Sequence, residues 1–297
     1  MKVWMDGSVV DGEAARLSVC DHGLLYGDGV FEGMRVYGGR VFRLADHLRR
    51  LAHSAAYIGL DLPYPLERIA EIVEETVAAH GSEEAYIRLV ATRGVGELGV
   101  DPLPCKAPQL FCIVAAIRLY AADVLAAGIN LVTTSVRKPP PDVLNPEVKS
   151  LNYLNSVMAK REARLRGADE GLVLNLQGKV AEASVANVFA WTDGHLVTPP
   201  TVDGALPGIT RATVLDAARD LGLPVAVRSI GHAELMRADE VFLSGSGARL
   251  VPVARLDTVG IGRATRPVFA QIERAFTEIS MSARPGQTTA RAALEAS

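Results

Sequence analysis

The sequence predicts an α+β protein built from two domains. Its 297 residues exceed the roughly 100–200 residues that one domain usually holds. Strand-like and helix-like runs are segregated along the first part of the chain, which is typical of α+β folds. We expect a small N-terminal domain over residues 1–118, a linker over 119–128, a larger domain over 129–281 and a flexible tail over 282–297.

The first domain is expected to contain two hairpins, two helices and two further strands. Asp6-Gly7 and Gly38-Gly39 are hairpin-turn signals. Pro65 is a helix-start signal and Gly81 is a helix-stop signal. The expected elements are strands over 3–10, 30–37 and 40–42, helices over 44–58 and 65–81, and strands over 85–92 and 109–117.

The second domain is expected to alternate strands with three long helices. Its proline tract, 139–141, must be an extended loop. Gln177-Gly178 and Asp193-Gly194 are turn signals that predict a meander. The expected elements are strands over 129–136, 170–176, 179–182, 187–191 and 240–244, and helices over 152–166, 208–221 and 266–279.

Composition excludes several functional classes. The net charge of −3 gives no basic footprint for nucleic acid. The longest apolar run, 110–117, is far shorter than the ~18 residues that a membrane helix needs. The three cysteines show no metal-ligand spacing, so we expect free thiols, no metal and a cytoplasmic location. The N-terminus has no apolar segment of the kind found in signal peptides.

Lys149 is the first candidate for chemistry. Apolar residues flank it closely, and a helix is expected just after it. A shielded lysine is easier to deprotonate than a surface lysine and can serve as a nucleophile or Schiff-base partner. The alternative is an ordinary solvated lysine.

Two glycine-containing turns and one arginine are candidates for binding a phosphate. Pro207-Gly208 leads directly into a helix, so the amides of Ile209 and Thr210 would point outward at its positive end. The segment 244–248 offers a hydroxyl and unhindered amides after a strand. Arg50 could supply a cation. Taken singly, such turns are more often structural, and Arg50 more often a solvated helix residue.

Glu182 and a strand with alternating polar side chains complete the candidates. Glu182 ends a short strand and precedes small residues, so it can face a planar ligand; otherwise it is a surface glutamate in a turn. Tyr86 and Arg88 alternate in one strand and share a face. Because a lone buried guanidinium is too costly, Arg88 is either ion-paired or part of a site.

The glycine-rich segment 26–35 is a candidate cavity wall. Its glycines permit close backbone approach, and Tyr26, Phe31 and Arg35 are candidates to line the cavity. His22 precedes this segment, but no nucleophile motif accompanies it, which favours a structural role.

Six segments together resemble the class IV, or fold-type IV, pyridoxal-phosphate aminotransferases over roughly residues 2–280. The match is closest to branched-chain amino acid aminotransferases of the prokaryotic type. Six segments in the family's order make the resemblance specific. They are DHGLLYGDGVFEGMRVY (21–37), VFRLADHLRRL (41–51), AYIRLVATRGVGELGVDP (85–102), NPEVKSLNYLNSVMAKREA (145–163), ALPGITR (205–211) and ADEVFLSGSGA (238–248).

The resemblance implies a D-amino acid aminotransferase-like fold with pyridoxal 5′-phosphate as cofactor. The larger domain would hold a mixed, barrel-like sheet. Lys149 would be the Schiff-base lysine and the catalytic base, Tyr153 would bond the cofactor's phenolic oxygen, and Glu182 would keep the pyridine nitrogen protonated. The phosphate would be held by Arg50, the amides of Ile209 and Thr210, and Ser246.

The resemblance also implies a substrate pocket and a partner chain. The pocket would be shaped by Tyr26, Phe31, Gly33, Arg35, Tyr86 and Arg88. The α-carboxylate would meet the amides of Gly247 and Ala248, with Tyr86. The family forms homodimers or larger assemblies with the active site at the domain interface. A loop near 98–102 would enter the neighbouring subunit's pocket.

The implied reaction is ping-pong transamination of leucine, isoleucine and valine with 2-oxoglutarate. Alternatives of the same fold are D-amino-acid aminotransferase, (R)-amine aminotransferase and aminodeoxychorismate lyase. A non-catalytic binding protein is disfavoured because the lysine, tyrosine, glutamate and arginine of the cofactor site are all present. Two departures bear on the substrate: Ala186 replaces an acidic residue, and Arg249 replaces a glutamate. An added arginine could favour a dicarboxylate or change how the carboxylate docks.

Overall fold

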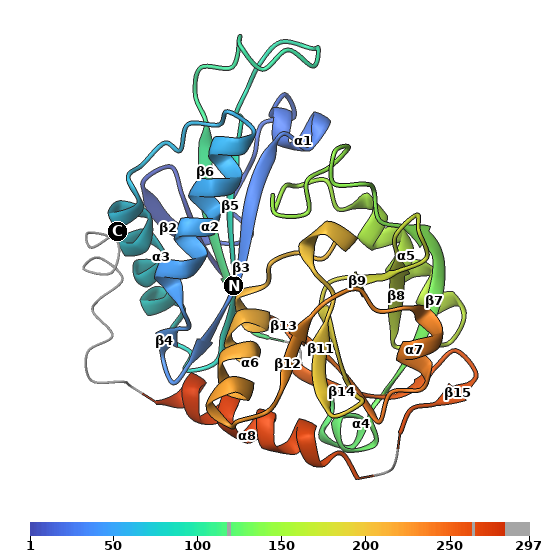
Figure 1. The fold of residues 1–297 in the computed structure, drawn as a ribbon. Coiled ribbons are helices and arrows are strands. Elements are labelled where there is room, and N and C mark those ends of the chain that lie inside the picture. The colour runs from blue at the N-terminus through green and yellow to red at the C-terminus, as the bar shows by residue number, and fades with distance from the viewer. Residues whose placement is uncertain (118–119, 263–264, 283–297) are drawn as a thin grey trace. The chain divides into compact units, whose positions relative to one another are not determined.

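The computed structural model describes residues 1–117, 120–262 and 265–282 (Figure 1). These residues form two compact units. The first unit contains residues 1–117, 148–152 and 280–282, and the second contains 120–147, 153–262 and 265–279. The segment 148–152, which carries Lys149, therefore belongs to the first unit although its sequence neighbours belong to the second. Most of the expected tail, 283–297, lies outside the described residues.

The first unit is built on a six-stranded antiparallel sheet in the order β2-β1-β6-β5-β3-β4. Its helices α2 and α3 pack against this sheet (Figure 1). The strands are β1 Lys2–Met5, β2 Ser8–Asp11, β3 Gly29–Tyr37, β4 Arg40–Val41, β5 Ala85–Thr92 and β6 Gln109–Ala115. The helices are α1 His22–Tyr26, α2 Leu44–Tyr57 and α3 Leu66–His80.

Local signals in the sequence explain most boundaries of the first unit. Asp6 and Gly7 both have positive φ, 51° and 84°, so the turn between β1 and β2 suits the twist of a two-residue hairpin. Gly81 ends α3 in the left-handed conformation, with φ of 75°. The short helix α1 was not predicted; it begins where the Asp21 carboxylate accepts the amide hydrogen of Gly23 (2.7 Å).

The core of the first unit lies between its sheet and its two long helices. Leucines on one side of α2 and isoleucines on one side of α3 meet apolar residues of the sheet. The fully buried members include Leu48, Leu51, Ile69, Ile72, Met34 and Ile87. This packing leaves one side of β3 and β5 facing away from the helices.

The second unit is built on a nine-stranded mixed sheet. Eight strands follow the order β12-β11-β10-β13-β14-β7-β8-β9, and β15 pairs with β14. Three pairings are parallel, namely β11 with β12, β14 with β7, and β7 with β8. The strands are β7 Ile129–Arg137, β8 Glu170–Leu174, β9 Val180–Ala183, β10 Asn187–Thr192, β11 His195–Thr198, β12 Val225–Val227, β13 Glu240–Gly245, β14 Arg249–Leu256 and β15 Val259–Gly260.

Five α-helices and a 3-10 turn surround this sheet in the described part of the second unit. They are α4 Ala122–Ala127, α5 Leu154–Leu165, η1 Thr201–Asp203, α6 Ile209–Asp220, α7 His232–Met236 and α8 Pro267–Met281, whose last residues belong to the first unit. The helix α4 occupies part of the expected linker, 119–128.

The predicted meander is wrong in its third strand. β8 and β9 pair as expected, but β10 pairs with β11 and β13 rather than with β9. The turn at Asp193-Gly194, with φ of 50° and 71°, folds β11 back onto one edge of β10. β13, which comes much later in the sequence, takes the other edge. Long-range pairing of this kind leaves no local signal.

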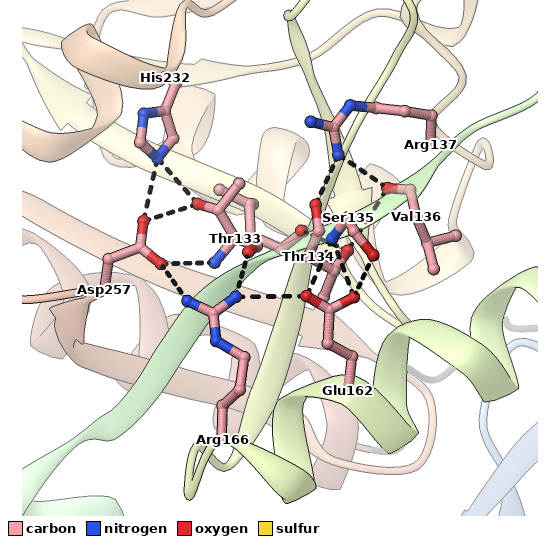
Figure 2. A network of polar contacts seen from close by, with 10 residues as sticks. Thr133, Thr134, Ser135, Val136, Arg137, Glu162, Arg166, His232 and Asp257 are labelled. Carbon is pink, nitrogen blue, oxygen red and sulfur yellow. Dashed lines mark hydrogen bonds and ion pairs between the residues drawn. The ribbon is translucent and has the colours of Figure 1, made fainter.

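A polar network ties β7 to α5 and to the turn between β14 and β15 (Figure 2). Asp257, in that turn, accepts the amide hydrogen of Thr133 (2.7 Å) and its hydroxyl hydrogen (2.8 Å). Glu162 of α5 accepts the amide hydrogen of Ser135 (2.9 Å to Oε2). These contacts fix the strand that leads to Lys138.

Candidate active site

The predicted site residues are distributed over both units. The first unit carries Tyr26, Phe31, Gly33, Arg35, Arg50, Tyr86, Arg88 and Lys149. The second carries Tyr153, Glu182, Ile209, Thr210, Ser246, Gly247 and Ala248.

The backbone around Lys149 is docked on the beginning of β3. The carbonyl of Lys149 accepts the amide hydrogen of Phe31 (3.0 Å), and the amide of Leu151 donates to the carbonyl of Gly29 (2.9 Å). On the other side, the amide of Lys149 donates to the hydroxyl of Ser54 in α2 (3.1 Å). A short strand-like segment, held by β3 and α2 together, therefore fixes the origin of the lysine side chain.

The side chain of Lys149 lies over an aromatic ring. Its Nζ is 4.5 Å from the centroid of the Phe31 ring. The guanidinium carbon of Arg88 is 4.4 Å from the same centroid. Both contacts have cation–π geometry, so the Phe31 ring is in contact with the amine and with the guanidinium. The structure thus brings together three residues that the sequence predicted for the site.

The side of β3 and β5 that carries Phe31 also carries most of the predicted pocket. In the antiparallel register Gly33 faces Arg88 and Arg35 faces Tyr86, so these four residues share the face of Phe31. A Cβ atom on Gly33 would lie 2.3 Å from the Tyr86 hydroxyl oxygen. Glycine at 33 is therefore required for the tyrosine to lie across the strand.

Arg88 lies among aromatic rings instead of acids. Its Nη2 donates to the Tyr86 hydroxyl (3.1 Å). Its Nε is buried and has no hydrogen-bond partner in residues 1–117, 120–262 and 265–282. No carboxylate in those ranges forms an ion pair with it. The sequence left a structural ion pair and a binding site open for Arg88, and this geometry favours the binding site.

Arg35 and Tyr26 are engaged by partners of their own. Arg35 donates from Nη2 to Glu84 (2.9 Å) and lies over the Tyr37 ring. The Tyr26 hydroxyl accepts the amide hydrogen of Gly99 (2.8 Å).

His22 has structural contacts. Its Nε2 is 2.9 Å from the Glu97 carbonyl oxygen, and its ring packs edge-on against Tyr26. These contacts join α1 to the loop after β5, as expected for a structural histidine.

Arg50 belongs to a buried cluster behind β3. Its Nε and Nη2 donate to the two carboxylate oxygens of Glu32 (2.8 and 2.7 Å), and His47 Nδ1 lies 2.7 Å from Glu32 Oε2. Glu32 is fully buried. Burial alone would raise the pKa of Glu32, but His47 and Arg50 outweigh it and lower that pKa to about 2. Burial lowers the pKa of His47, although the Glu32 carboxylate beside it opposes this shift.

The alternative reading of Arg50 as a solvated helix arginine is therefore wrong. Its guanidinium is oriented by a buried carboxylate from β3. The sequence reading assigned no role to Glu32 or His47. The available signal was an acid at position 32 of a strand-like segment that is otherwise mostly apolar, because an acid buried there needs a partner.

Glu182 is at the centre of the polar contacts of the second unit. Its Oε1 accepts a hydrogen bond from Lys138 Nζ (2.5 Å), and its Oε2 accepts the amide hydrogen of Leu206 (2.9 Å). The side chain is 11% exposed. The alternative of a surface glutamate is therefore wrong. Lys138 was not among the predicted site residues.

The turn before α6 is held in place by Glu182 and Asn187. Asn187 donates from Nδ2 to the carbonyl of Leu206 (2.8 Å). Glu182 and Asn187 together therefore bind the amide and the carbonyl of Leu206. A Cβ on Gly208 would lie 2.1 Å from the side-chain oxygen of Asn187. The amides of Ile209 and Thr210 follow in the first turn of α6, where no carbonyl of the helix can accept them. An anion fits this positively polarised end.

Ser246, Gly247 and Ala248 form the loop between β13 and β14. The loop closes where Gly245 pairs with Arg249, whose φ of 64° is left-handed. The guanidinium of Arg249 donates to the hydroxyl of Thr277 in α8 (2.8 Å). In this structure the charged group of Arg249 is therefore bonded to α8, and its expected effect on a substrate carboxylate stays a prediction.

Ala186 lies in the turn between β9 and β10. Its carbonyl accepts the amide hydrogen of Ala183 (2.8 Å). Its side chain is partly buried against the core of the second unit. An alanine there removes a charge and fills an apolar position.

The grouping of Thr133, His232 and Asp257 does not have the geometry of a proton relay (Figure 2). Both the Thr133 hydroxyl (2.8 Å) and an Asp257 oxygen (3.2 Å) approach the same ring nitrogen, Nε2. A relay needs the acid and the nucleophile on opposite nitrogens of the ring. The network is structural. In the parts of the chain that the structure describes, no group of acids, histidines and cysteines has the arrangement of a metal site.

None of the helices formed by the described residues is both long and apolar enough to cross a membrane.

Comparison with known proteins gives matches along nearly the whole chain. The sequence pattern of the amino-transferase class IV family matches residues 29–256. A putative branched-chain-amino-acid aminotransferase of Methanocaldococcus jannaschii is 46% identical over 258 residues, which are 86% of this chain and 88% of that protein.

Two solved structures match the whole fold. The branched-chain aminotransferase from Thermoproteus uzoniensis with norvaline has a TM-score of 0.89 at 39% identity and covers 96% of both chains. The branched-chain amino acid aminotransferase of Escherichia coli has a TM-score of 0.88 at 31% identity and covers 96% of this chain and 97% of that chain. The predicted fold-type IV architecture is confirmed.

A third solved structure bears on the cofactor. It is a branched-chain amino acid aminotransferase with pyridoxamine 5′-phosphate, and it has a TM-score of 0.91 at 35% identity. It covers 96% of this chain and 95% of that chain. The expected cofactor class, a pyridoxal-type phosphate, is therefore confirmed for this fold.

Replacing Glu32 by glutamine should strongly destabilise the protein. The variant leaves the guanidinium of Arg50 buried without its acid, which should lower the free energy of unfolding by about 3–5 kcal/mol. Because the pKa of Glu32 is lowered from 4.5 to about 2, its contribution is complete above pH 4.5 and is lost as the pH falls toward 2. The difference between wild type and variant in urea unfolding should therefore shrink across that range.

Glu71→Gln is the matched control for this measurement. Glu71 is a half-exposed carboxylate of α3 that pairs with Arg68. Its loss should change the free energy of unfolding by less than about 1 kcal/mol. Equal urea midpoints for the two variants at pH 7 would contradict the role given to Glu32.

Proposed function

Because the chain belongs to the class IV aminotransferases, we propose that it uses pyridoxal 5′-phosphate to transfer amino groups from branched-chain amino acids to 2-oxoglutarate. The observation that carries the proposal is the docking of the Lys149 segment on β3, with the lysine amine and Arg88 over one ring. The branched-chain preference is supported by the names of the similar proteins and by the apolar ring beside the lysine.

The residues present fit a cofactor that carries a phosphate and a pyridine ring. The phosphate would be held by Arg50, Ser246 and the amides of Ile209 and Thr210; the tight packing of Gly208 against Asn187 shapes that cradle. Glu182 would bind the ring nitrogen and Tyr153 the phenolic oxygen. When bound, pyridoxal phosphate supplies an aldehyde for the amino group and a ring that withdraws electrons from the substrate.

Lys149 would move the proton in each half of the reaction. Its Nζ would take the proton from the α-carbon of the amino acid and return it to the neighbouring carbon of the cofactor. Glu182 would hold a proton on the ring nitrogen throughout. The keto acid of the donor would leave before 2-oxoglutarate enters, which is a ping-pong order.

One pocket would accept both an apolar and an acidic side chain. The α-carboxylate common to all substrates would meet the amides of Gly247 and Ala248 and the Tyr86 hydroxyl. Arg88 would bind the second carboxylate of 2-oxoglutarate, because it is a cation with no acid bonded to it in the described ranges of the chain. With leucine bound, the guanidinium would stay on the Phe31 ring. Arg35 and Tyr26 would shape the pocket from its edges.

A second copy of the chain is the proposed partner. Large apolar side chains in the loop after β5 are exposed, including Leu98 (84%), Val100 (82%) and Leu103 (76%). Such a group usually marks a protein interface. The amide of Gly99 is tied to the Tyr26 hydroxyl, so this loop is anchored beside a predicted pocket residue. We expect a homodimer or a larger assembly in the cytoplasm, with this loop reaching the neighbouring subunit's pocket.

A donor panel separates the proposed activity from its alternatives. L-leucine, L-valine, D-alanine, D-glutamate and (R)-1-phenylethylamine would each be offered with 2-oxoglutarate. We expect kcat/KM for L-leucine to exceed that for D-alanine and for the aryl amine by at least ~10-fold. Lys149→Ala should lower turnover by at least ~1000-fold.

Other outcomes of the panel favour other functions. A preference for D-alanine or the aryl amine would reject the branched-chain assignment. Release of pyruvate without an acceptor would indicate a lyase. Equal, negligible turnover by wild type and Lys149→Ala would indicate a binding protein.

Arg88→Met should separate the two half-reactions. Loss of a charged hydrogen bond to the second carboxylate should raise KM for 2-oxoglutarate by about 10–100-fold. The half-reaction with L-leucine, measured by single-turnover absorbance, should change by less than about 3-fold because leucine has no second carboxylate. Equal losses with both substrates would contradict the role of Arg88.

A further inference from the structure

Lys138 is a charged residue directly after β7 that has no role in the proposed reaction. Its amide donates to the carbonyl of Leu174 in β8 (3.0 Å), and the rigid tract 139–141 follows it. Its side-chain stem packs on Gly204, where an added Cβ would lie 3.1 Å from Lys138 Cβ. Both the origin and the path of this side chain are therefore fixed.

The amine of Lys138 is directed at Glu182. The distance from Nζ to Glu182 Oε1 is 2.5 Å, and the two side chains are only 21% and 11% exposed. In the ranges that the structure describes, no other carboxylate forms an ion pair with this amine. Burial alone would lower the pKa of Lys138, but Glu182 first and Tyr153 second outweigh it and raise that pKa.

An acid that is to hold a proton on a pyridine nitrogen must itself stay ionised. A cation beside a buried carboxylate favours its charged form, and Lys138 occupies that place beside Glu182. Each carboxylate oxygen accepts about two hydrogen bonds, so with Lys138 on Oε1 and the Leu206 amide on Oε2 the carboxylate can still accept a further donor.

We propose that Lys138 is a positioning residue that keeps Glu182 ionised and aimed at the cofactor's ring nitrogen. The inference rests on the proposed function, because the ring nitrogen belongs to pyridoxal phosphate. Lys138 also lies within electrostatic reach of Tyr153, the residue proposed for the phenolic oxygen. Lys138 would thus act on Glu182, the partner of the ring nitrogen, and on Tyr153, the partner of the phenolic oxygen.

The simpler alternative is an ion pair that only stabilises the second unit by joining the end of β7 to β9. Both accounts predict lower stability when Lys138 is lost. Only the positioning role predicts a pH-dependent loss of cofactor binding that the charge of an arginine restores.

The test is titration of apoprotein with pyridoxal phosphate between about pH 5 and pH 8, read by the visible absorbance of the bound cofactor. For Lys138→Met we expect the dissociation constant to rise by about tenfold toward pH 5 and by less near neutral pH, because a buried carboxylate without a neighbouring cation is protonated more readily as the pH falls. Lys138→Arg should keep the flat wild-type profile.

Three further variants make the outcome decisive. Lys179→Met removes an exposed lysine that precedes the same strand as Glu182, and it should bind as wild type does. Lys138→Gln replaces the methionine variant if that variant does not fold. In a Glu182→Gln background, removing Lys138 should have no further effect on the dissociation constant, whereas a purely structural ion pair would give additive losses.

The results separate this inference from the proposed function. If wild-type protein does not bind pyridoxal phosphate, the proposed function fails. If wild type binds and Lys138→Met binds equally well at every pH, only the role of Lys138 is overturned. A loss that arginine does not restore, or that persists in the Glu182→Gln background, also overturns it.

Discussion

The buried ion pair between Glu32 and Arg50 fixes the part of the first unit on which the site depends. It joins β3 to α2 in a place that excludes water, and His47 completes the set of donors to the carboxylate. The same strand and the same helix hold the backbone of Lys149, through Phe31 and Ser54. A change in the relative position of β3 and α2 would therefore move the lysine.

An arginine lies on each side of β3, but in the described ranges only one of the two forms an ion pair with an acid. On the side of α2, the charge of Arg50 is matched by an acid inside the fold. On the other side, Arg88 has aromatic rings and a hydroxyl as neighbours and no bonded acid within the described ranges. Leaving a guanidinium in that state is costly unless a ligand supplies the charge. One side of β3 thus meets an ion pair that is complete within the fold, and the other side meets Arg88 of β5, which we propose binds an anionic ligand.

Local signals in the sequence predicted much of the fold. The candidate site was predicted from the six segments that resemble the class IV aminotransferases. Gly81 and Asp6-Gly7 ended elements where the backbone needs positive φ, which a sequence reveals directly. The pairing of β10 with β13 was missed because it depends on contacts between distant segments. Lys138 was missed for the same reason: beside a proline tract it looks like a surface residue, and only the fold brings Glu182 to it. The direction of Arg249 also depends on α8, which is far away in sequence.

The central claim is that Lys149 is the residue that binds the cofactor. It is tested most directly by treating the holoprotein with borohydride, digesting it and locating the pyridoxyl group by peptide mass spectrometry. We expect the group on the single peptide that contains Lys149, at about one per chain. Recovery of the group on Lys138 or on any other lysine, or the absence of any modified peptide, would contradict the claim.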